Sequence, residues 1–300
     1  MDPLVMVFGL GVGVLIGMTG IGGGSLMTPL LILFAGVHPT VAIGTDLAYG
    51  ALTKTVGGWR HLRKGTVDLG VSKWLAFGSV PGSILGVVLL DAVLKRRPDI
   101  LLTGVAVALL VVAVSILFRA LFLQAAIARE RDTVVLTTTV KASAVGLGAV
   151  LGLLLGLTSV GSGALIGLAL ILVFRLTPHR VVGTDVFHAA IVLWAAGLAQ
   201  GVAGNIDFVL MGNILIGSLP GVLIGTALID RIPSVVLRPL LGCVLLGSAL
   251  GVLTKAGVDL PTWTIVGVPA LVGLAFTLVH RGRARHRAMN EKPTPEVVPV

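Results

Sequence analysis

The sequence predicts an all-α polytopic membrane protein, and three observations lead to this prediction: the composition, a series of long apolar runs and an internal repeat. Of the 300 residues, 56% are hydrophobic and 12% are charged, and the mean hydropathy is +1.06. A soluble domain has about 25% charged residues, so this chain has too few polar side chains to cover a globule in water. The composition excludes a soluble enzyme and a disordered chain. The single cysteine, Cys243, excludes an intrachain disulfide.

Nine apolar runs follow one another along the chain. A membrane-spanning helix needs about 20 residues, and seven runs have about this length, near 41–59, 70–91, 99–118, 181–200, 208–229, 235–253 and 262–280. The runs at 4–36 and 142–174 are longer, and glycine clusters interrupt them at 17–25 and 156–163. Since each glycine weakens a helix by up to about 1 kcal/mol, each long run is predicted to form two shorter helices.

Short polar segments separate these runs. Asp68 and Asp207 directly precede the runs at 70–91 and 208–229, so we expect both to be helix N-caps. The 20 residues at the C-terminus, 281–300, are basic and then proline-rich, and we expect them to be disordered.

The two halves of the chain are related by a shift of 139 residues. Over positions 17–91 the shift gives 23 identities in 75 positions without a gap. The matches include glycines, prolines and acids; Gly44-Thr45-Asp46, for example, meets Gly183-Thr184-Asp185. The chain therefore divides into a first repeat (1–118), a connecting loop (119–141), a second repeat (142–253), an extra helix (254–280) and a tail (281–300).

The distribution of basic residues predicts the topology, because cytoplasmic loops are enriched in Lys and Arg. Lys54 lies within a span and is left out of the count; if each glycine-broken segment is a hairpin that returns to its own side, 17 Lys and Arg lie inside and 4 outside. If each crosses once, the counts are 9 inside and 12 outside. We therefore expect inverted repeats, each a hairpin plus three spans, with the N-terminus outside and the C-terminus in the cytoplasm. The net charge of +9 is then a topology signal, and no nucleic-acid partner is expected.

Inverted repeats with interrupted helices are typical of secondary transporters, whose sites lie where the broken helices expose backbone groups. Half-helix N-termini offer free N–H groups that suit anions. We therefore expect a small-oxyanion site at the glycine breaks, with Lys54 as counter-charge; no metal, cofactor or catalytic residue is expected. The predicted substrate-binding residues besides Lys54 are Thr19, Gly22, Gly23, Gly24, Ser25, Thr158, Ser159, Gly161, Ser162 and Gly163.

Charged residues inside apolar runs each need a reason, because a charge at the bilayer centre is costly. Asp46 and Asp185 are repeat equivalents, and we expect them to gate protons or bind a coupling cation; interfacial placement is the alternative. His188 follows Asp185 by three residues, and its repeat equivalent is Tyr49. His188 and Tyr49 are further candidates for coupling, the alternative for His188 being a polar core residue.

These motifs resemble those of the TauE/SafE sulfite exporter family. The resemblance rests on Gly-Ile-Gly-Gly-Gly-Ser at 20–25, Val-Ala-Ile-Gly-Thr at 41–45, Trp-Arg-His-Leu-Arg-Lys-Gly-Thr-Val-Asp at 59–68 and their counterparts in the second half. It implies a bacterial inner-membrane exporter of sulfite or an organosulfonate. Where the family has Gly-Thr-Ser, this chain has Gly-Thr-Asp twice, which favours proton coupling.

The sequence leaves other functions open. A cation transporter could use the two acids, and a passive anion channel could use the same site. A remote alternative is an intramembrane serine hydrolase built on Ser162 and His188. The expected partners are a small inorganic or organic sulfur anion and the lipid bilayer, and a homodimer is left open.

Overall fold

The computed structural model describes residues 3–19, 24–122, 132–228 and 234–290, and these residues form α-helices, one 3₁₀ helix and connecting turns. The helices are α1 (Pro3–Thr19), α2 (Gly24–Leu33), α3 (Pro39–Arg63), α4 (Leu69–Ala92), η1 (Leu94–Arg96), α5 (Pro98–Phe122), α6 (Thr138–Thr158), α7 (Ala164–Leu172), α8 (Pro178–Val202), α9 (Phe208–Leu228), α10 (Ser234–Lys255) and α11 (Thr262–Asn290). The predicted all-α fold is confirmed, and so is the division of the second long run, into α6 and α7.

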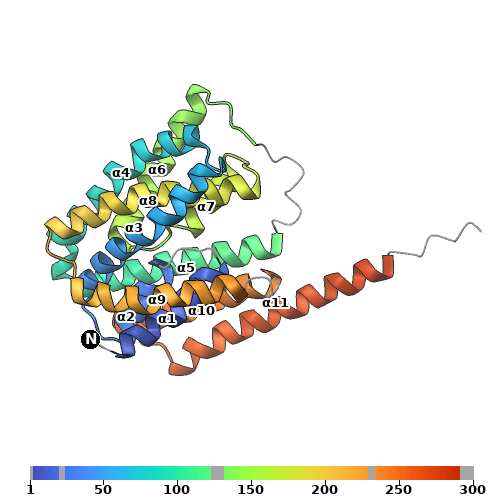
Figure 1. Cartoon of the computed structure of the whole chain (residues 1–300). Coiled ribbons are helices and arrows are strands. Elements are labelled where there is room, and N and C mark those ends of the chain that lie inside the picture. The colour runs from blue at the N-terminus through green and yellow to red at the C-terminus, as the bar shows by residue number, and fades with distance from the viewer. Residues whose placement is uncertain (1–2, 20–23, 123–131, 229–233, 291–300) are drawn as a thin grey trace, which may run out of the picture.

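Six of the described helices are long and apolar enough to cross a membrane: α4, α5, α6, α8, α9 and α11. Helix α3 has the same length as its repeat equivalent α8 but carries Asp46 and Lys54 in its middle and basic residues at its end. These charges make α3 less apolar. It lies inside the bundle, against α8 (Figure 1).

Both predicted N-caps are confirmed. Asp68 Oδ1 accepts a hydrogen bond from the backbone N–H of Val71 at 2.9 Å, and Asp207 Oδ1 accepts one from that of Leu210 at 2.9 Å. These bonds satisfy N–H groups that have no partner inside their own helix.

The tail prediction is wrong for residues 281–290. Helix α11 continues to Asn290 and extends beyond the rest of the bundle (Figure 1). The arginines and alanines of this stretch are good helix formers, so the polar composition ends the membrane span without ending the helix. Residues 291–300 lie outside the described residues. The linker between the repeats is also shorter than expected, because α5 ends at Phe122 and α6 begins at Thr138.

Helix contacts repeat when the two halves are exchanged. Helix α1 packs on α9 and α6 packs on α4, and α3 packs on α8 and α5 on α10. These are the pairs related by exchange of the two repeats. Both α1–α9 and α4–α6 are glycine interfaces, in which an added Cβ at every fourth residue would collide with backbone of the partner helix. Such contacts let two helices approach closely, as small residues do in membranes.

The same contacts fix the helix directions. Helices α1 and α9 run parallel, as do α4 and α6, because glycines further along one helix pack on later residues of the other. Helices α3 and α8 run antiparallel, since Gly50 packs on Leu193 and Gly57 on the earlier residue Val186. The equivalent helices α3 and α8 therefore point in opposite directions, and the inversion of the whole repeats stays a prediction. The orientation of the two halves relative to a membrane stays a prediction.

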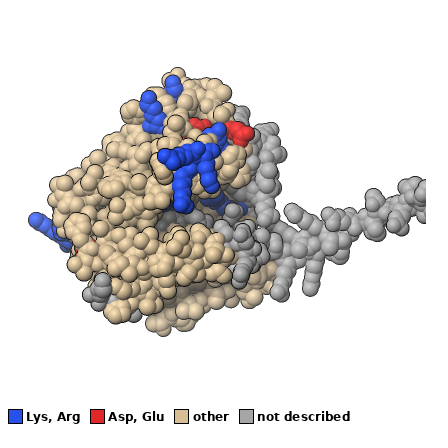
Figure 2. Space-filling view, viewed as in Figure 1, with Lys and Arg blue, Asp and Glu red and all other residues tan. Residues whose placement is uncertain are grey.

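Charged side chains are unevenly placed on the surface. Figure 2 shows Lys and Arg gathered around the end of the bundle where α3 ends and α8 begins, while most of the surface in this view carries neither sign. The last residue of α3, Arg63, lies at this end, as do Lys64 in the turn that follows and Arg175 in the turn before α8. We define this end as the basic end.

Candidate functional site

The second helix break is built by two residues with positive φ. Helix α6 stops at Thr158 because Ser159 adopts the left-handed conformation, with φ of 60°. Gly161 follows with φ of 103°, a value that favours glycine. Helix α7 then begins at Ala164. In the first repeat α1 ends at Thr19 and α2 begins at Gly24, and residues 20–23 lie outside the described residues.

The start of α2 meets the second break in the centre of the protein. A Cβ added at Gly24 would lie 2.5 Å from the carbonyl oxygen of Ser159 and 3.4 Å from Asp46 Oδ2. No side chain fits at Gly24 without moving the other break. The start of α2, the end of α6 and the middle of α3 therefore share one small space.

Asp46 joins three segments in this space. Its side chain is buried, and Oδ2 accepts hydrogen bonds from Thr28 Oγ1 at 2.6 Å and from Ser159 Oγ at 2.7 Å. Thr28 lies on α2 and Ser159 lies in the break of the other repeat. The second oxygen, Oδ1, is buried without a hydrogen-bond partner among the described residues. Asp46 therefore keeps one oxygen available for a proton or a ligand.

Lys54 binds the other end of the same break. Its Nζ donates a hydrogen bond to the carbonyl oxygen of Ser162 at 2.9 Å, and its side chain is buried. Lys54 follows Asp46 by eight residues, or roughly 12 Å along the axis of α3 at 1.5 Å per residue. Helix α3 of the first repeat thus holds both ends of the second repeat's break.

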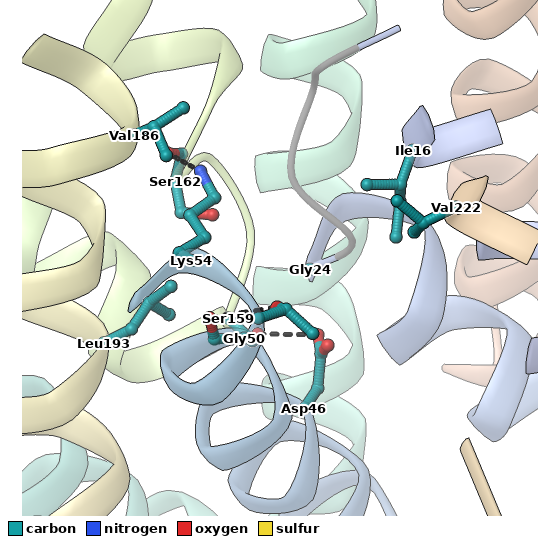
Figure 3. Close-up of a pocket in the computed structure, with 11 residues that line it drawn as sticks. Ile16, Gly24, Asp46, Gly50, Lys54, Ser159, Ser162, Val186, Leu193 and Val222 are labelled. Atoms are coloured by element: carbon teal, nitrogen blue, oxygen red, sulfur yellow. Dashed lines mark hydrogen bonds between the residues drawn. The ribbon is translucent and has the colours of Figure 1, made fainter. Parts of the chain in front are cut away.

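A cavity of about 150 Å³ lies between these groups (Figure 3). It has room for several water molecules or one small oxyanion, since a water molecule takes about 30 Å³ in the liquid. Gly50, near the middle of α3, contributes to its wall, which places the cavity halfway along the bundle. The polar lining residues are Asp46, Thr53, Lys54, Ser159 and Ser162, and the apolar ones include Ile16, Val186, Leu193 and Val222.

Backbone donors accompany these side chains. Within the described residues, no hydrogen bond uses the N–H groups of Gly161, Ser162 or Gly163. These groups precede the N-terminus of α7, where unpaired N–H groups and the helix dipole favour a negative charge. The break can therefore offer amides to an anion next to the Lys54 ammonium.

The structure divides the predicted substrate-binding residues into groups. Four line the cavity: Gly24, Lys54, Ser159 and Ser162. Ser25, Thr158, Gly161 and Gly163 are buried beside it. The hydroxyl of Thr158 donates to the Leu154 carbonyl at 2.7 Å, so its proton serves its own helix. Gly22 and Gly23 lie outside the described residues, as does the side chain of Thr19, the last residue of α1.

The predicted coupling residues also differ in whether they line the cavity. Asp46 lines the cavity, whereas Asp185, Tyr49 and His188 are buried but do not. His188 Nε2 lies 3.2 Å from Ser79 Oγ, and the repeat-equivalent Tyr49 lies beside Ser218, the equivalent of Ser79. His188 and Tyr49 are therefore equivalent core positions on α8 and α3.

Sequence reasoning missed Thr28 and Thr53. Thr28 lies one turn after Gly24, on the face of α2 that meets α3, and its repeat equivalent is Gly167. The comparison of the halves draws attention to identical residues, so it passes over Thr28. Thr53 is the neighbour of Lys54 and lines the same cavity.

Nothing in the described residues supports the hydrolase alternative. A serine–histidine pair needs its side chains within hydrogen-bond reach, but the His188 ring engages Ser79, and Ser162 takes part through its carbonyl. The described residues also contain no cluster of three or more His, Cys, Asp or Glu that could hold a metal ion.

Comparisons with known proteins agree with this site. The family model "Sulfite exporter TauE/SafE" matches residues 5–252. The chain is 37% identical over 224 residues to the probable membrane transporter protein YjnA of Bacillus subtilis, a match that covers 74% of this chain and 87% of YjnA. It is 26% identical over 226 residues to the probable membrane transporter protein YdhB of the same organism, covering 75% and 89%. No solved structure matches the chain.

Proposed function

The chain belongs to the sulfite exporter TauE/SafE family, and we propose that it is a secondary transporter that exports a small sulfur oxyanion, such as sulfite or an organosulfonate. The family and the two relatives are membrane transporters, so the chain is a transporter rather than an enzyme. The substrate class, the direction and the mechanism are the proposal.

The central cavity carries the proposal. An oxyanion needs a positive charge and several hydrogen-bond donors once it has lost its water. The Lys54 ammonium supplies the charge, and the hydroxyl of Ser162 and the amides of the break supply donors. The space is too small for a bulky organic substrate and fits a tetrahedral or pyramidal oxyanion.

The arrangement of the two halves supports alternating access. The equivalent helices α3 and α8 run antiparallel, and the start of α2 meets the break between α6 and α7. If the halves exchange conformations, the cavity opens first to one side and then to the other without moving far itself. Glycine interfaces such as α1–α9 give each half a close-packed unit that can move as a body.

The positive-inside rule places the basic end in the cytoplasm. We therefore propose a bacterial inner-membrane location, with residue 3 near the outer face and the end of α11 inside. Lys95, Arg96 and Arg97 lie at the opposite end, on and after η1, and they are the exception to this distribution.

One observation favours a second candidate, a cation transporter. Asp46 lines the same cavity as Lys54 and has one oxygen without a described partner. A cation would bind Asp46 only against the repulsion of the Lys54 ammonium, so the anion is the better fit.

Flux from proteoliposomes of the purified protein tests the proposal. We expect release of sulfite or of an organosulfonate, and loss of most of this flux in Lys54→Gln. Lys255→Gln is the matched control, because Lys255 also donates to a backbone carbonyl, that of Ile32 at 2.5 Å, but lies away from the cavity. Folded protein that moves none of sulfite, organosulfonates and thiosulfate, but moves a cation through Asp46, would replace the anion with the second candidate. An anion flux that ignores a pH gradient would favour a passive channel.

A further inference from the structure

Asp46 and Asp185 occupy equivalent positions in the two repeats but have different surroundings. We infer that Asp46 alone carries the coupling proton, one for each monovalent anion, and that Asp185, which does not line the cavity, is a positioning residue that compensates the charges of Lys54 and Arg119. This inference rests on the proposed anion transport, and it assigns separate roles to two residues that the sequence treats alike.

Neutral donors surround the Asp46 carboxyl. The hydroxyls of Thr28 and Ser159 both donate to Oδ2, while Oδ1 has no described partner. Both hydroxyls come from the walls of the cavity or its immediate surroundings, and Oδ2 lies 3.4 Å from where a Cβ of Gly24 would be. A proton on Asp46 would therefore be in the same compartment as the bound anion.

Two cations act electrostatically on the Asp185 carboxyl, whose Oδ1, like that of Asp46, is buried without a hydrogen-bond partner among the described residues. Lys54 and Arg119 are both close enough to act electrostatically on it. Arg119 reaches this position because Gly167 has no side chain; a Cβ at Gly167 would lie 3.3 Å from an Arg119 guanidinium nitrogen. Asp185 itself does not line the cavity. Asp185 therefore acts on the site through these two cations rather than through a direct contact with the cavity.

The sequence differences between the halves follow this division. The two hydroxyl donors to Asp46, Thr28 and Ser159, have glycine at both equivalent positions of the other half, Gly167 and Gly20. Lys54 is likewise replaced by Leu193 in the second half. Asp46 thus has hydroxyl donors that the second half lacks, and the second half has, at Gly167, space for a guanidinium.

Charge balance fixes the number of protons. The charged group contains two acids, Asp46 and Asp185, and two bases, Lys54 and Arg119, of which Arg119 is only half-buried, so the empty site is neutral when all four are ionised. A monovalent anion leaves one uncompensated negative charge in a poorly hydrated space, which is costly. One proton on Asp46 restores neutrality and removes the acid nearest the anion as a source of repulsion.

Other titratable or charged groups face α3 from its neighbours. Helix α2 contributes none. Among these groups are Tyr49 on α3 itself, Asp207 before α9, and Asp99 and Arg119 on α5; those on α8 are His179, Arg180, Asp185 and His188. Asp207 caps α9 and His188 contacts Ser79, so neither shares the cavity with Asp46.

Anion counterflow and gradient-driven flux together test the division. Counterflow exchanges labelled for unlabelled anion and needs no net proton movement. Asp46→Asn should lose the stimulation of flux by a pH gradient, measured relative to whatever rate of counterflow the variant retains. Asp185→Asn and the charge-conserving Asp185→Glu should keep their response to the gradient, even where the maximal rate falls. Loss of the response in Asp185→Asn with counterflow intact, or its retention in Asp46→Asn, overturns the inference.

Thermal unfolding tests the Asp185–Arg119 half without any flux. Arg119→Gln and Asp185→Asn should each lower the apparent unfolding temperature, and the double variant should be no less stable than either, because removing both charges leaves none unpaired. The decreases in unfolding temperature caused by Arg119→Gln and by Asp46→Asn should simply add in the double variant. If the effects of Arg119→Gln and Asp185→Asn on the unfolding temperature add, Asp185 does not compensate the charge of Arg119. If the wild type moves no anion while this coupling is found, the proposed function fails and the positioning role stands.

Discussion

Replacing Gly148 by alanine tests the close packing of α6 on α4. The added Cβ would collide with the carbonyl oxygen of Leu75 and lie 3.1 Å from both the Leu75 carbonyl carbon and the Ser79 nitrogen. These are backbone atoms of a packed helix, so they cannot rotate away as a flexible side chain would. The two helices must separate, or α4 must bend.

The size of the effect follows from two opposing terms. Alanine in place of glycine stabilises a helix by about 0.5–1 kcal/mol. Overpacking a tight contact costs about 1–3 kcal/mol. Gly146 provides the control on the same helix, because nothing lies within 4 Å of a Cβ added there. Gly146→Ala should therefore only gain helix stability, whereas Gly148→Ala should lower the free energy of unfolding by about 0.5–2 kcal/mol overall.

The apparent unfolding temperature of the purified protein in detergent measures this difference. At roughly 2–4 °C per kcal/mol, Gly148→Ala should unfold several degrees below Gly146→Ala. Trp74 reports on this interface, because Lys141 near the start of α6 lies 5.1 Å from its ring. Equal unfolding temperatures for the two variants would show that the α4–α6 contact is looser than described, and the argument from helix contacts to helix direction would lose its basis.

Three further predictions concern the site and the topology. Lys54→Gln should weaken anion binding by about tenfold or more, because one charge-assisted hydrogen bond is worth about 1.5–3 kcal/mol. Lys54→Arg should restore part of the lost affinity. If titration calorimetry gives the wild type and both variants equal affinities, Lys54 is not part of the site. Thr28→Val should lower the apparent unfolding temperature, because it removes a hydrogen-bond donor to Asp46. The same substitution should lower that temperature by less in an Asp46→Asn background. If the two decreases simply add, the hydrogen bond contributes nothing to stability. Cysteines placed at Leu62 and Asp259, in a variant without the native cysteine, should react with impermeant maleimide from opposite sides of the membrane; labelling from one side would exclude the proposed topology.

Local features of the fold were predictable from the sequence. Asp68 and Asp207 could be recognised as N-caps because an N-cap bonds within its own first turn. The end of α6 could be recognised because glycine clusters weaken helices wherever they occur. The repeat relation needed only comparison of the chain with itself. Family membership rested on the same short motifs.

The partners of the polar residues depended on the tertiary structure. Asp46 bonds to Thr28, 18 residues away, and to Ser159, 113 residues away, and Lys54 bonds across 108 residues to Ser162. No spacing rule predicts these bonds, because they arise from the packing of α3 against the break of the other repeat.

The sequence by itself determined the class of protein, the repeat and the positions of the breaks, because hydrophobicity, glycine content and capping act over one or two helical turns. Only the tertiary structure decided that Asp46 lines the cavity while Asp185 does not. The two acids have the same neighbours in sequence, Gly-Thr before each. Their difference comes from side chains that other helices bring to them, a hydroxyl from Thr28 in one half and a guanidinium over Gly167 in the other.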